Sequence, residues 1–273
     1  MQHKLTDITF TIFDTETTGL SPQEGDRIVE IAAARTKNGR TIDTFGTLVN
    51  PHRAISEAAF RVNQITPEML QNAPVMNEVM PRFLDFIKDS CLCSYNAGFD
   101  LEFLNYELRL LGQGPLEQIA VIDVLKMARR LIPGLARYNL SFVTEALGIQ
   151  IPQKHRALDD VELTRTLFNK CLAMVDQRGS LDFANFAALF ALGARFLDET
   201  VNRKITEIQE AIDRGINIKI KYLATSNAEV TEREITPREI RYERGHQYLI
   251  GHCYLRNGER AFRIDSILHM EIV

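Results

Sequence analysis

Residues 8–20, ITFTIFDTETTGL, begin as a β-rich apolar run and end with two carboxylates, Asp14 and Glu16. Successive side chains of a strand point to opposite faces, so these acids, two positions apart, are expected on one face. Neighbouring carboxylates repel each other unless protons or cations hold them together. Hard oxygen ligands suit Mg²⁺ or Mn²⁺. This stretch therefore leaves two interpretations open, a metal site and a solvated acidic strand end.

Three β-rich runs fill the first fifty residues, at 8–13, 27–34 and 41–49. The dipeptide Asn38-Gly39 stands between the second and third runs and predicts a tight hairpin. Helices and buried strands then alternate, with helices expected at 75–87, 99–111, 140–147 and 157–175 and strands at 91–95 and 119–124. A meander followed by alternating helices and strands predicts an α/β fold with a mixed sheet flanked by helices.

The pattern changes twice after Asp176. Residues 176–214 contain no proline and are expected to be helical, with an apolar stripe at Phe183, Phe186, Phe190, Ala194 and Leu197. The stripe indicates packing on the helix's own domain, and a dimer or interdomain surface is the alternative. From Ile216 the apolar period becomes two, and strands are expected at 216–222, 241–243, 248–254 and 260–264. We therefore expect an N-terminal domain at 1–175, a helical linker at 176–204 and a small β-barrel or sandwich at 205–273.

The composition is that of an ordinary globular protein, with 45% hydrophobic and 25% charged residues in 273. Charge is unevenly spread. Residues 214–273 hold 10 Lys and Arg against 8 Asp and Glu, which leaves 22 against 28 elsewhere. An acidic body is compatible with nucleic-acid binding when its carboxylates hold divalent cations, because the metals then supply positive charge.

The compartment is expected to be the cytoplasm. The four cysteines are too few and too dispersed for a disulfide framework, so reduced core thiols are expected. No N-terminal stretch combines basic residues with an apolar region, as a secretory signal would. The most apolar helical segment, 181–197, is interrupted by Asp182, Asn185 and Arg195, so no membrane span is expected.

Three further candidates stand near expected helix starts. Asp100 follows the strand at 91–95 and begins the next helix. His155 lies on a loop, and Asp160 falls in the first turn of the helix that follows. Asp100 is also explained as a residue favoured by the helix dipole. Beside Asp160, Asp159 is the competing carboxylate and the more typical helix-start residue. A lone histidine is usually structural. A histidine that precedes a helix carrying a carboxylate is better placed for catalysis.

The strings FDTETTGL, SYNAGFD and HRALDD occur in this order and resemble the three exonuclease motifs of the DnaQ-like (DEDDh) superfamily. The resemblance spans residues 7–175 and implies a ribonuclease H-like fold and 3′→5′ exonuclease activity. It places the family's four carboxylates on Asp14, Glu16, Asp100 and Asp160, and its histidine on His155.

The resemblance also implies a two-metal mechanism with two divalent cations, Mg²⁺ or Mn²⁺. Asp14 would bridge both ions, Glu16 and Asp160 would hold the ion on the nucleophile side, and Asp100 would hold the other through water. His155 would act as general base. The substrate-contacting positions implied for the terminal nucleotide are Thr17, Leu20, Asn96 and Phe99. Leu20 would insert against the last base and favour single-stranded or frayed 3′ ends.

Two positions depart from the family pattern. Relatives often carry histidine where this chain has Tyr95, and glycine where it has Gln64 in the segment RVNQITPEML. Neither position holds a metal. We therefore expect altered selection of substrate ends and retained activity.

Residues 205–273 resemble a WYL domain, a small Sm/SH3-like barrel. The resemblance rests on IKIKY, ITPREI, HQYLIGHC and RAFRIDSI, and Gln247 stands where the name-giving tryptophan would be. Relatives bind nucleic acid or a nucleotide-like ligand through basic and aromatic side chains, because guanidinium groups suit phosphates and aromatic faces suit bases. The candidates here are Arg238, Arg241, Tyr248, Arg260 and Arg263. An ordinary solvated surface is the alternative.

The leading hypothesis is therefore a 3′→5′ exonuclease that releases nucleoside monophosphates. DNA is favoured over RNA because nothing in the sequence reads a 2′-hydroxyl. The alternative is a non-hydrolytic, nucleic-acid-binding sensor. Clustered carboxylates repel one another and give such a module no advantage, and no helix-turn-helix signal precedes the barrel. A homodimer and a polymerase or repair partner stay open.

Overall fold

The structure is a computed structural model that describes residues 4–117, 119–149, 156–176, 181–193, 195–224 and 227–273, without the side chains of 195–197. The chain divides into two compact units. The N-terminal unit comprises Thr6–Met127 and Leu135–Lys170, and the C-terminal unit comprises Met1–Leu5, Ala128–Gly134 and Cys171–Val273. Each unit has its own sheet and is described by itself.

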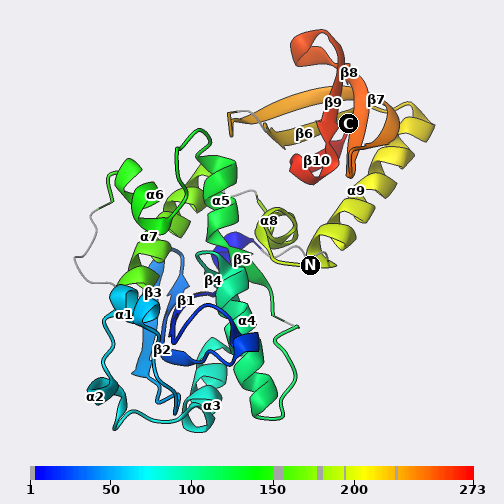
Figure 1. The fold of residues 1–273 in the computed structure, drawn as a ribbon. Helices are drawn as coiled ribbons and strands as arrows, with labels where there is room; N and C mark the ends of the chain where they lie inside the picture. Colours follow the sequence, from blue (N-terminus) through cyan, green and yellow to red (C-terminus); the bar gives the residue numbers. More distant parts are fainter. Residues whose placement is uncertain (1–3, 118, 150–155, 177–180, 194, 225–226) are drawn as a thin grey trace. The chain divides into compact units, whose positions relative to one another are not determined.

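The N-terminal unit is built on a five-stranded mixed sheet in the order β3-β2-β1-β4-β5 (Figure 1). Strands β1, β2 and β3 pair antiparallel, and β4 and β5 run parallel to β1. The strands are β1 (Phe10–Thr17), β2 (Ile28–Lys37), β3 (Arg40–Leu48), β4 (Cys91–Ser94) and β5 (Val121–Asp123). The helices that lie wholly or partly in this unit are η1 (Leu5–Asp7), η2 (Pro22–Glu24), α1 (Glu57–Asn63), α2 (Pro67–Leu70), α3 (Met76–Ile87), α4 (Ala97–Leu110), α5 (Val124–Leu131), α6 (Leu140–Ala146) and α7 (Ala157–Val175). The first residue of η1 and the last turns of α5 and α7 belong to the C-terminal unit. The predicted α/β fold with a mixed sheet is confirmed.

The hairpin predicted at Asn38-Gly39 joins β2 to β3. Both turn residues have positive φ, 52° at Asn38 and 74° at Gly39. A two-residue turn of this type needs positive φ at both positions, which asparagine and glycine adopt most readily. The turn therefore sets the register of β2 against β3, with Lys37 opposite Arg40.

Helices cover both faces of the sheet (Figure 1). The Phe10 ring packs on Phe168 of α7, with 5.0 Å between ring centroids. The Phe13 ring lies 6.2 Å from Phe83 of α3. Because Phe10 and Phe13 are three positions apart in β1, they point to opposite faces of the sheet. The helices α7 and α3 therefore pack on opposite sides of β1.

The C-terminal unit is a five-stranded antiparallel sheet in the order β10-β6-β7-β8-β9 with a helix packed on it. Its elements are α8 (Phe183–Phe190), α9 (Arg195–Arg214), β6 (Ile218–Leu223), β7 (Val230–Glu243), β8 (His246–Cys253), η3 (Tyr254–Arg256), β9 (Gly258–Arg263), η4 (Ile264–Ser266) and β10 (Ile267–Ile272). Ile208 and Ala211 of α9 join the buried core of this sheet. In the described part of the chain β9 and β10 form the two edges, so a closed Sm/SH3-like barrel is not confirmed.

Two details of the C-terminal unit differ from expectation. The single helix expected over 176–214 is interrupted, because α8 ends at Phe190, Ala191 is extended and Gly193 has φ 79°. A glycine in this left-handed conformation ends a helix readily. Strand β7 is also far longer than the predicted 241–243. Only Ile235 and Pro237 of this strand are buried, and most of its other positions are polar or charged, so the sequence shows little apolar alternation here.

Two further expectations concern the whole chain. All four cysteines are free and buried, as expected for small core residues. No helix among the described residues is both long and apolar enough to cross a membrane.

Candidate active site

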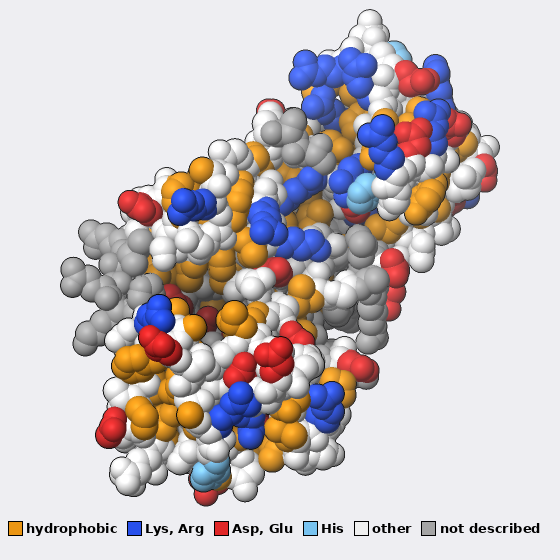
Figure 2. Space-filling view, in the orientation of Figure 1, with side chains coloured by type: hydrophobic (Ala, Val, Ile, Leu, Met, Phe, Trp, Pro, Cys, Tyr) orange, Lys and Arg blue, Asp and Glu red, His pale blue; other side chains and the backbone are white. Residues whose placement is uncertain are grey.

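The acidic site lies at the end of β1. Asp14 and Glu16 are the only positions of β1 that are not fully buried. Asp160 comes from the first turn of α7. One carboxylate oxygen from each of these three residues lies within 4.8 Å of the others. Figure 2 shows acidic side chains inside a hollow of the N-terminal unit, with hydrophobic side chains around it.

The electrostatics of this cluster are unfavourable without cations. Burial raises the pKa of Asp14 well above its usual range, and the charges of Asp100, Glu16 and Asp160 raise it further. Burial, followed by the charges of Asp160 and Glu30, raises the pKa of Glu16 to about 8. Carboxylates held together against such repulsion form a site of excess negative charge. The donor set therefore fits hard divalent cations such as Mg²⁺ or Mn²⁺.

Asp100 is adjacent to this cluster but is not a member of it. Its Oδ1 accepts hydrogen bonds from the Thr15 backbone N–H at 3.0 Å and the Thr15 hydroxyl at 2.7 Å. Its Oδ2 accepts one from the Ser94 hydroxyl at 2.6 Å. Burial raises the pKa of Asp100 to about 6, although these hydrogen bonds lower it. The structure thus brings three of the four predicted carboxylates within 4.8 Å and places the fourth on protein donors beside them.

An ion pair between a buried glutamate and a partly exposed arginine, which the sequence analysis missed, fixes the start of α7. Glu30 of β2 accepts hydrogen bonds from Arg156 Nη2 at 2.6 Å and Nε at 3.0 Å. The backbone N–H of Ala157, the first residue of α7, donates to Glu30 at 3.3 Å. In the sequence, Glu30 interrupts the apolar run IVEIAAA, and a charged residue at such a position indicates a buried carboxylate that needs a partner. The predicted His155 precedes Arg156 and lies outside the described residues.

The substrate positions implied by the resemblance lie at the ends of β1 and β4. Thr17 is buried and donates from its hydroxyl to the Gly19 carbonyl at 2.6 Å, whereas Leu20 is 84% exposed. Asn96 has φ 64° and precedes α4. The ring of Phe99, in the first turn of α4, packs on Phe103 at 4.9 Å.

The two departures from the family pattern have structural roles. Gln64 ends α1 with φ 55°, a conformation that glycine adopts without strain. Its side chain donates to the carbonyls of Phe60 and Arg61 at 3.1 and 2.9 Å. The Tyr95 hydroxyl donates to the Tyr138 carbonyl at 2.6 Å. Backbone conformation therefore accounts for the glycine found in relatives at position 64, and the effect of both departures on end selection stays a prediction.

The predicted C-terminal candidates form two groups. Arg241 and Arg263 both lie opposite Tyr248 in the sheet, so the three side chains form one cross-strand row. Arg238 forms an ion pair with Glu259 at 2.7 Å, and Arg260 donates to the Glu259 carbonyl at 3.1 Å. In the row, Arg241 is paired with Glu239 and Glu243, and Arg263 with Asp265.

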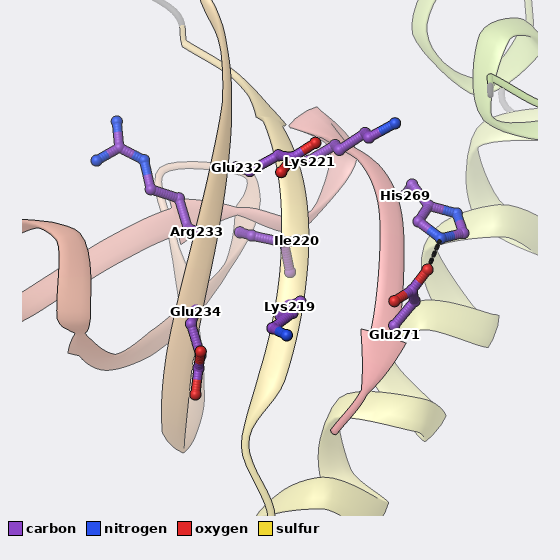
Figure 3. A pocket seen from close by; sticks show the side chains of 8 residues that line it. All are labelled: Lys219, Ile220, Lys221, Glu232, Arg233, Glu234, His269 and Glu271. Atoms are coloured by element: carbon purple, nitrogen blue, oxygen red, sulfur yellow. Dashed lines mark hydrogen bonds and ion pairs between the residues drawn. The ribbon is translucent and has the colours of Figure 1, made fainter. Parts of the chain in front are cut away.

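A separate pocket of about 250 Å³ lies over β6, β7 and β10 (Figure 3). Lys219 and Lys221 are its central cations. Each lies between acidic or histidine neighbours on the flanking strands, Glu232 and Glu234 on β7 and His269 and Glu271 on β10. Because cations and carboxylates alternate across the sheet here, the pocket offers no excess positive charge for a phosphate. None of the predicted ligand residues lines it.

Comparison with known proteins agrees with the motifs. The family model for exonucleases of the RNase T type matches residues 11–168, and the WYL domain model matches residues 203–272. DNA polymerase III PolC-type of Staphylococcus aureus is 36% identical over 178 residues, which is 65% of this chain. The chain spans only 12% of the length of that relative.

Two solved structures share the fold. The nuclease domain of 3′hExo, a DEDDh family member bound to rAMP, superposes with a TM-score of 0.54 at 20% identity, covering 60% of this chain and 91% of that one. E. coli Exonuclease I with a dT13 oligonucleotide superposes with a TM-score of 0.55 at 19% identity, covering 89% and 55%. The resemblance to DnaQ-like exonucleases is confirmed. Because the exonuclease model covers more than half of the chain, this protein belongs to the exonuclease family, with a WYL domain at its C-terminal end.

Proposed function

We propose that this protein is a metal-dependent 3′→5′ exonuclease that releases nucleoside monophosphates from DNA. The observation that carries the proposal is the cluster of Asp14, Glu16 and Asp160, whose oxygens lie within 4.8 Å of one another. Burial and the neighbouring carboxylates raise the pKa values of Asp14 and Glu16, and at Glu16 the charge of Arg156 offsets this only in part. Membership of the exonuclease family supplies the reaction class.

Each carboxylate has a proposed task. Asp14, Glu16 and Asp160 would hold two divalent cations, Mg²⁺ or Mn²⁺, with Asp100 supporting them. Bound divalent cations neutralise the anionic phosphate and acidify water. His155 would accept the proton from the attacking water, because an imidazole has a pKa suited to a general base near neutral pH. The Glu30–Arg156 pair would hold the start of α7, and with it Asp160, beside β2.

The 3′ terminal nucleotide would lie against Thr17, Leu20, Asn96 and Phe99. Leu20 supports this assignment because it projects into solvent four residues after Glu16. An exposed leucine offers an apolar contact to the last base, which favours single-stranded or frayed ends. We infer DNA in preference to RNA because none of the four proposed contact residues is expected to recognise the 2′-hydroxyl that distinguishes RNA.

We further propose that the WYL domain, as a small Sm/SH3-like barrel, binds nucleic acid or a nucleotide-like ligand through the row of Arg241, Tyr248 and Arg263. The aromatic face would stack on a base between two guanidinium groups. Arg241 is paired with Glu239 in an exposed ion pair, which contributes about 0–1 kcal/mol, so a phosphate can replace that carboxylate. The Arg263–Asp265 pair is less exposed and would keep the second guanidinium in place beside Tyr248. Loss of oligonucleotide binding in Tyr248→Ala, measured by fluorescence anisotropy on the full chain with Ca²⁺, tests this role.

The decisive test of the enzyme is digestion of one oligonucleotide labelled at its 5′ or 3′ end, prepared as DNA and as RNA. Wild type and Asp160→Asn are compared in Mg²⁺, Mn²⁺ and EDTA. We expect the 3′ label to leave at once as a mononucleotide and the 5′ label to remain on fragments that shorten stepwise. Asp160→Asn and EDTA should stop both. A non-hydrolytic sensor would bind and release nothing, and internal fragments would show an endonuclease.

A further inference from the structure

The loop between β1 and β2, residues 18–27, carries the most exposed large apolar side chain of the described residues, Leu20 at 84%. A single exposed leucine is ordinary in a folded protein and needs no functional explanation. The loop that carries Leu20 is unusual, because one buried carboxylate accepts hydrogen bonds from residues on both sides of the leucine.

That carboxylate is Asp26, which is 8% exposed. Its Oδ1 accepts a hydrogen bond from the Thr18 hydroxyl at 2.9 Å. Its Oδ2 accepts one from the backbone N–H of Ser21 at 3.1 Å. Arg53 Nη2 lies 3.4 Å from Oδ1 and provides the counter-charge. Asp26 thus joins the residues two before and one after Leu20.

Gly19 is required by this arrangement for reasons of space. A Cβ at position 19 would lie 2.2 Å from Asp26 Oδ2, far inside van der Waals contact. The carboxylate therefore lies directly against the backbone of Gly19, and the loop from Thr18 to Ser21 is wrapped around it. Any side chain at position 19 would push the carboxylate away and move Leu20.

Backbone hydrogen bonds close the loop at both ends. The Thr18 N–H donates to the Arg27 carbonyl at 2.9 Å, and the Asp26 N–H donates to the Ser21 carbonyl at 3.1 Å. The Ser56 N–H donates to the Thr18 carbonyl at 2.9 Å and joins the loop to the start of α1. The backbone that carries Leu20 is therefore held on both sides by hydrogen bonds.

We propose that Asp26 is a positioning residue that holds Leu20 rigidly beside the acidic cluster, so that Leu20 discriminates unpaired from paired 3′ ends. This inference rests on the proposed function. A rigid apolar group loses little conformational entropy when a base packs on it, whereas a mobile one would give up much of the contact energy. Asp26 acts only through Leu20, since its oxygens are occupied by Thr18, Ser21 and Arg53.

The test compares Asp26→Asn, Leu20→Ala and their double variant with wild type. Asp26→Asn keeps the shape but places an amide N–H opposite the Ser21 N–H or the Thr18 hydroxyl. Substrates carry the same 3′ sequence as a single strand, a terminal mismatch or a full duplex. We expect both single variants to change the duplex-to-single-strand ratio of kcat/KM by a similar factor, about tenfold, and the double variant to add no further change. Asp85→Asn, an exposed carboxylate of α3, is the matched control and should leave the ratio unchanged.

A second readout does not depend on hydrolysis. An oligonucleotide with 2-aminopurine at its 3′ end is bound in Ca²⁺, and hydrogen exchange of residues 18–25 is measured. Asp26→Asn should accelerate exchange and reduce the fluorescence change on binding, as Leu20→Ala reduces it. If Asp26→Asn does not fold, Arg53→Ala serves in its place. It removes the counter-charge of Asp26, and because the Arg53 side chain is 43% exposed, its loss leaves no cavity in the core. It should shift both readouts in the same direction.

The outcomes separate the two proposals. A wild type that binds the probe but releases no nucleotide contradicts the proposed enzyme, and the fluorescence series still tests Asp26. Faster exchange in Asp26→Asn with unchanged end discrimination and unchanged fluorescence overturns the positioning role. So does a duplex-to-single-strand ratio that changes in Leu20→Ala and stays at the wild-type value in Asp26→Asn.

Discussion

Raising the pH from 5 to 8 in EDTA is expected to lower the free energy of unfolding, because the folded protein keeps protons that the unfolded chain has released. The pKa of Glu16 is about 8 in the folded protein against 4.5 for an unperturbed glutamate. Its contribution is fully present below the unfolded pKa and is lost as the pH rises through the folded pKa. One such group gives a limiting slope of about 1.4 kcal/mol per pH unit.

The size of the effect follows from this window. Between pH 5 and 8 the single-group limit is about 4 kcal/mol. Partial exposure of the cluster and proton sharing among its carboxylates reduce the expected loss to about 2 kcal/mol. The pKa of Asp100 is about 6 in the folded protein against 3.8 for an unperturbed aspartate. Asp100 therefore adds to the loss of unfolding free energy between roughly pH 4 and 6.

Urea unfolding followed by far-UV circular dichroism measures this loss, since the chain has no tryptophan. Glu16→Gln should flatten the profile between pH 6 and 8, whereas Glu145→Gln, an exposed residue of α6, should reproduce wild type. Adding Mn²⁺ at pH 8 should restore stability, by about 2.7 kcal/mol at 100 times the Kd. A wild-type profile that is flat or rising from pH 5 to 8, and unaltered by Glu16→Gln, would refute the electrostatic account of the cluster.

Other substitutions test single contacts. Arg156→Ala removes the charged partner of Glu30, which then keeps only the Ala157 N–H, and should cost about 2 kcal/mol in urea unfolding. A loss below about 1 kcal/mol would show that the pair is unimportant. Gln64→Val should destabilise by about 1–2 kcal/mol and Gln64→Gly should not, because only glycine adopts positive φ freely; equal stabilities would contradict this. Tyr95→His should change the relative rates on single-stranded, mismatched and duplex ends, and three unchanged rates would remove Tyr95 from end selection. Tyr95→Phe loses the hydrogen bond to Tyr138 and should cost about 1 kcal/mol in the same unfolding assay.

Features that depend on local pattern could be predicted from the sequence. Strand alternation placed Asp14 and Glu16 on one face, and the structure shows both as the partly exposed positions of β1. The Asn38-Gly39 dipeptide located a hairpin because its residues accept positive φ. A helix was expected at 157–175, and α7 begins at Ala157 with Asp160 in its first turn.

Features that depend on tertiary contacts could not be predicted in this way. Nothing near Glu30 in the sequence reveals that Arg156, 126 residues later, is its partner. The hydrogen bonds from Thr15 that occupy Asp100 likewise arise only when α4 meets the end of β1. The break between α8 and α9 was missed because Gly193 stands inside an apolar stripe that continues at helical spacing on both sides.

The central claim is that Asp14, Glu16 and Asp160 form a divalent-cation site. Anomalous diffraction from crystals soaked in Mn²⁺ tests it most directly. The account predicts at least one strong manganese peak within about 2.2 Å of carboxylate oxygens from this cluster, absent in Asp160→Asn crystals soaked alongside. Crystals at full Mn²⁺ occupancy elsewhere but without density between these three side chains would contradict it.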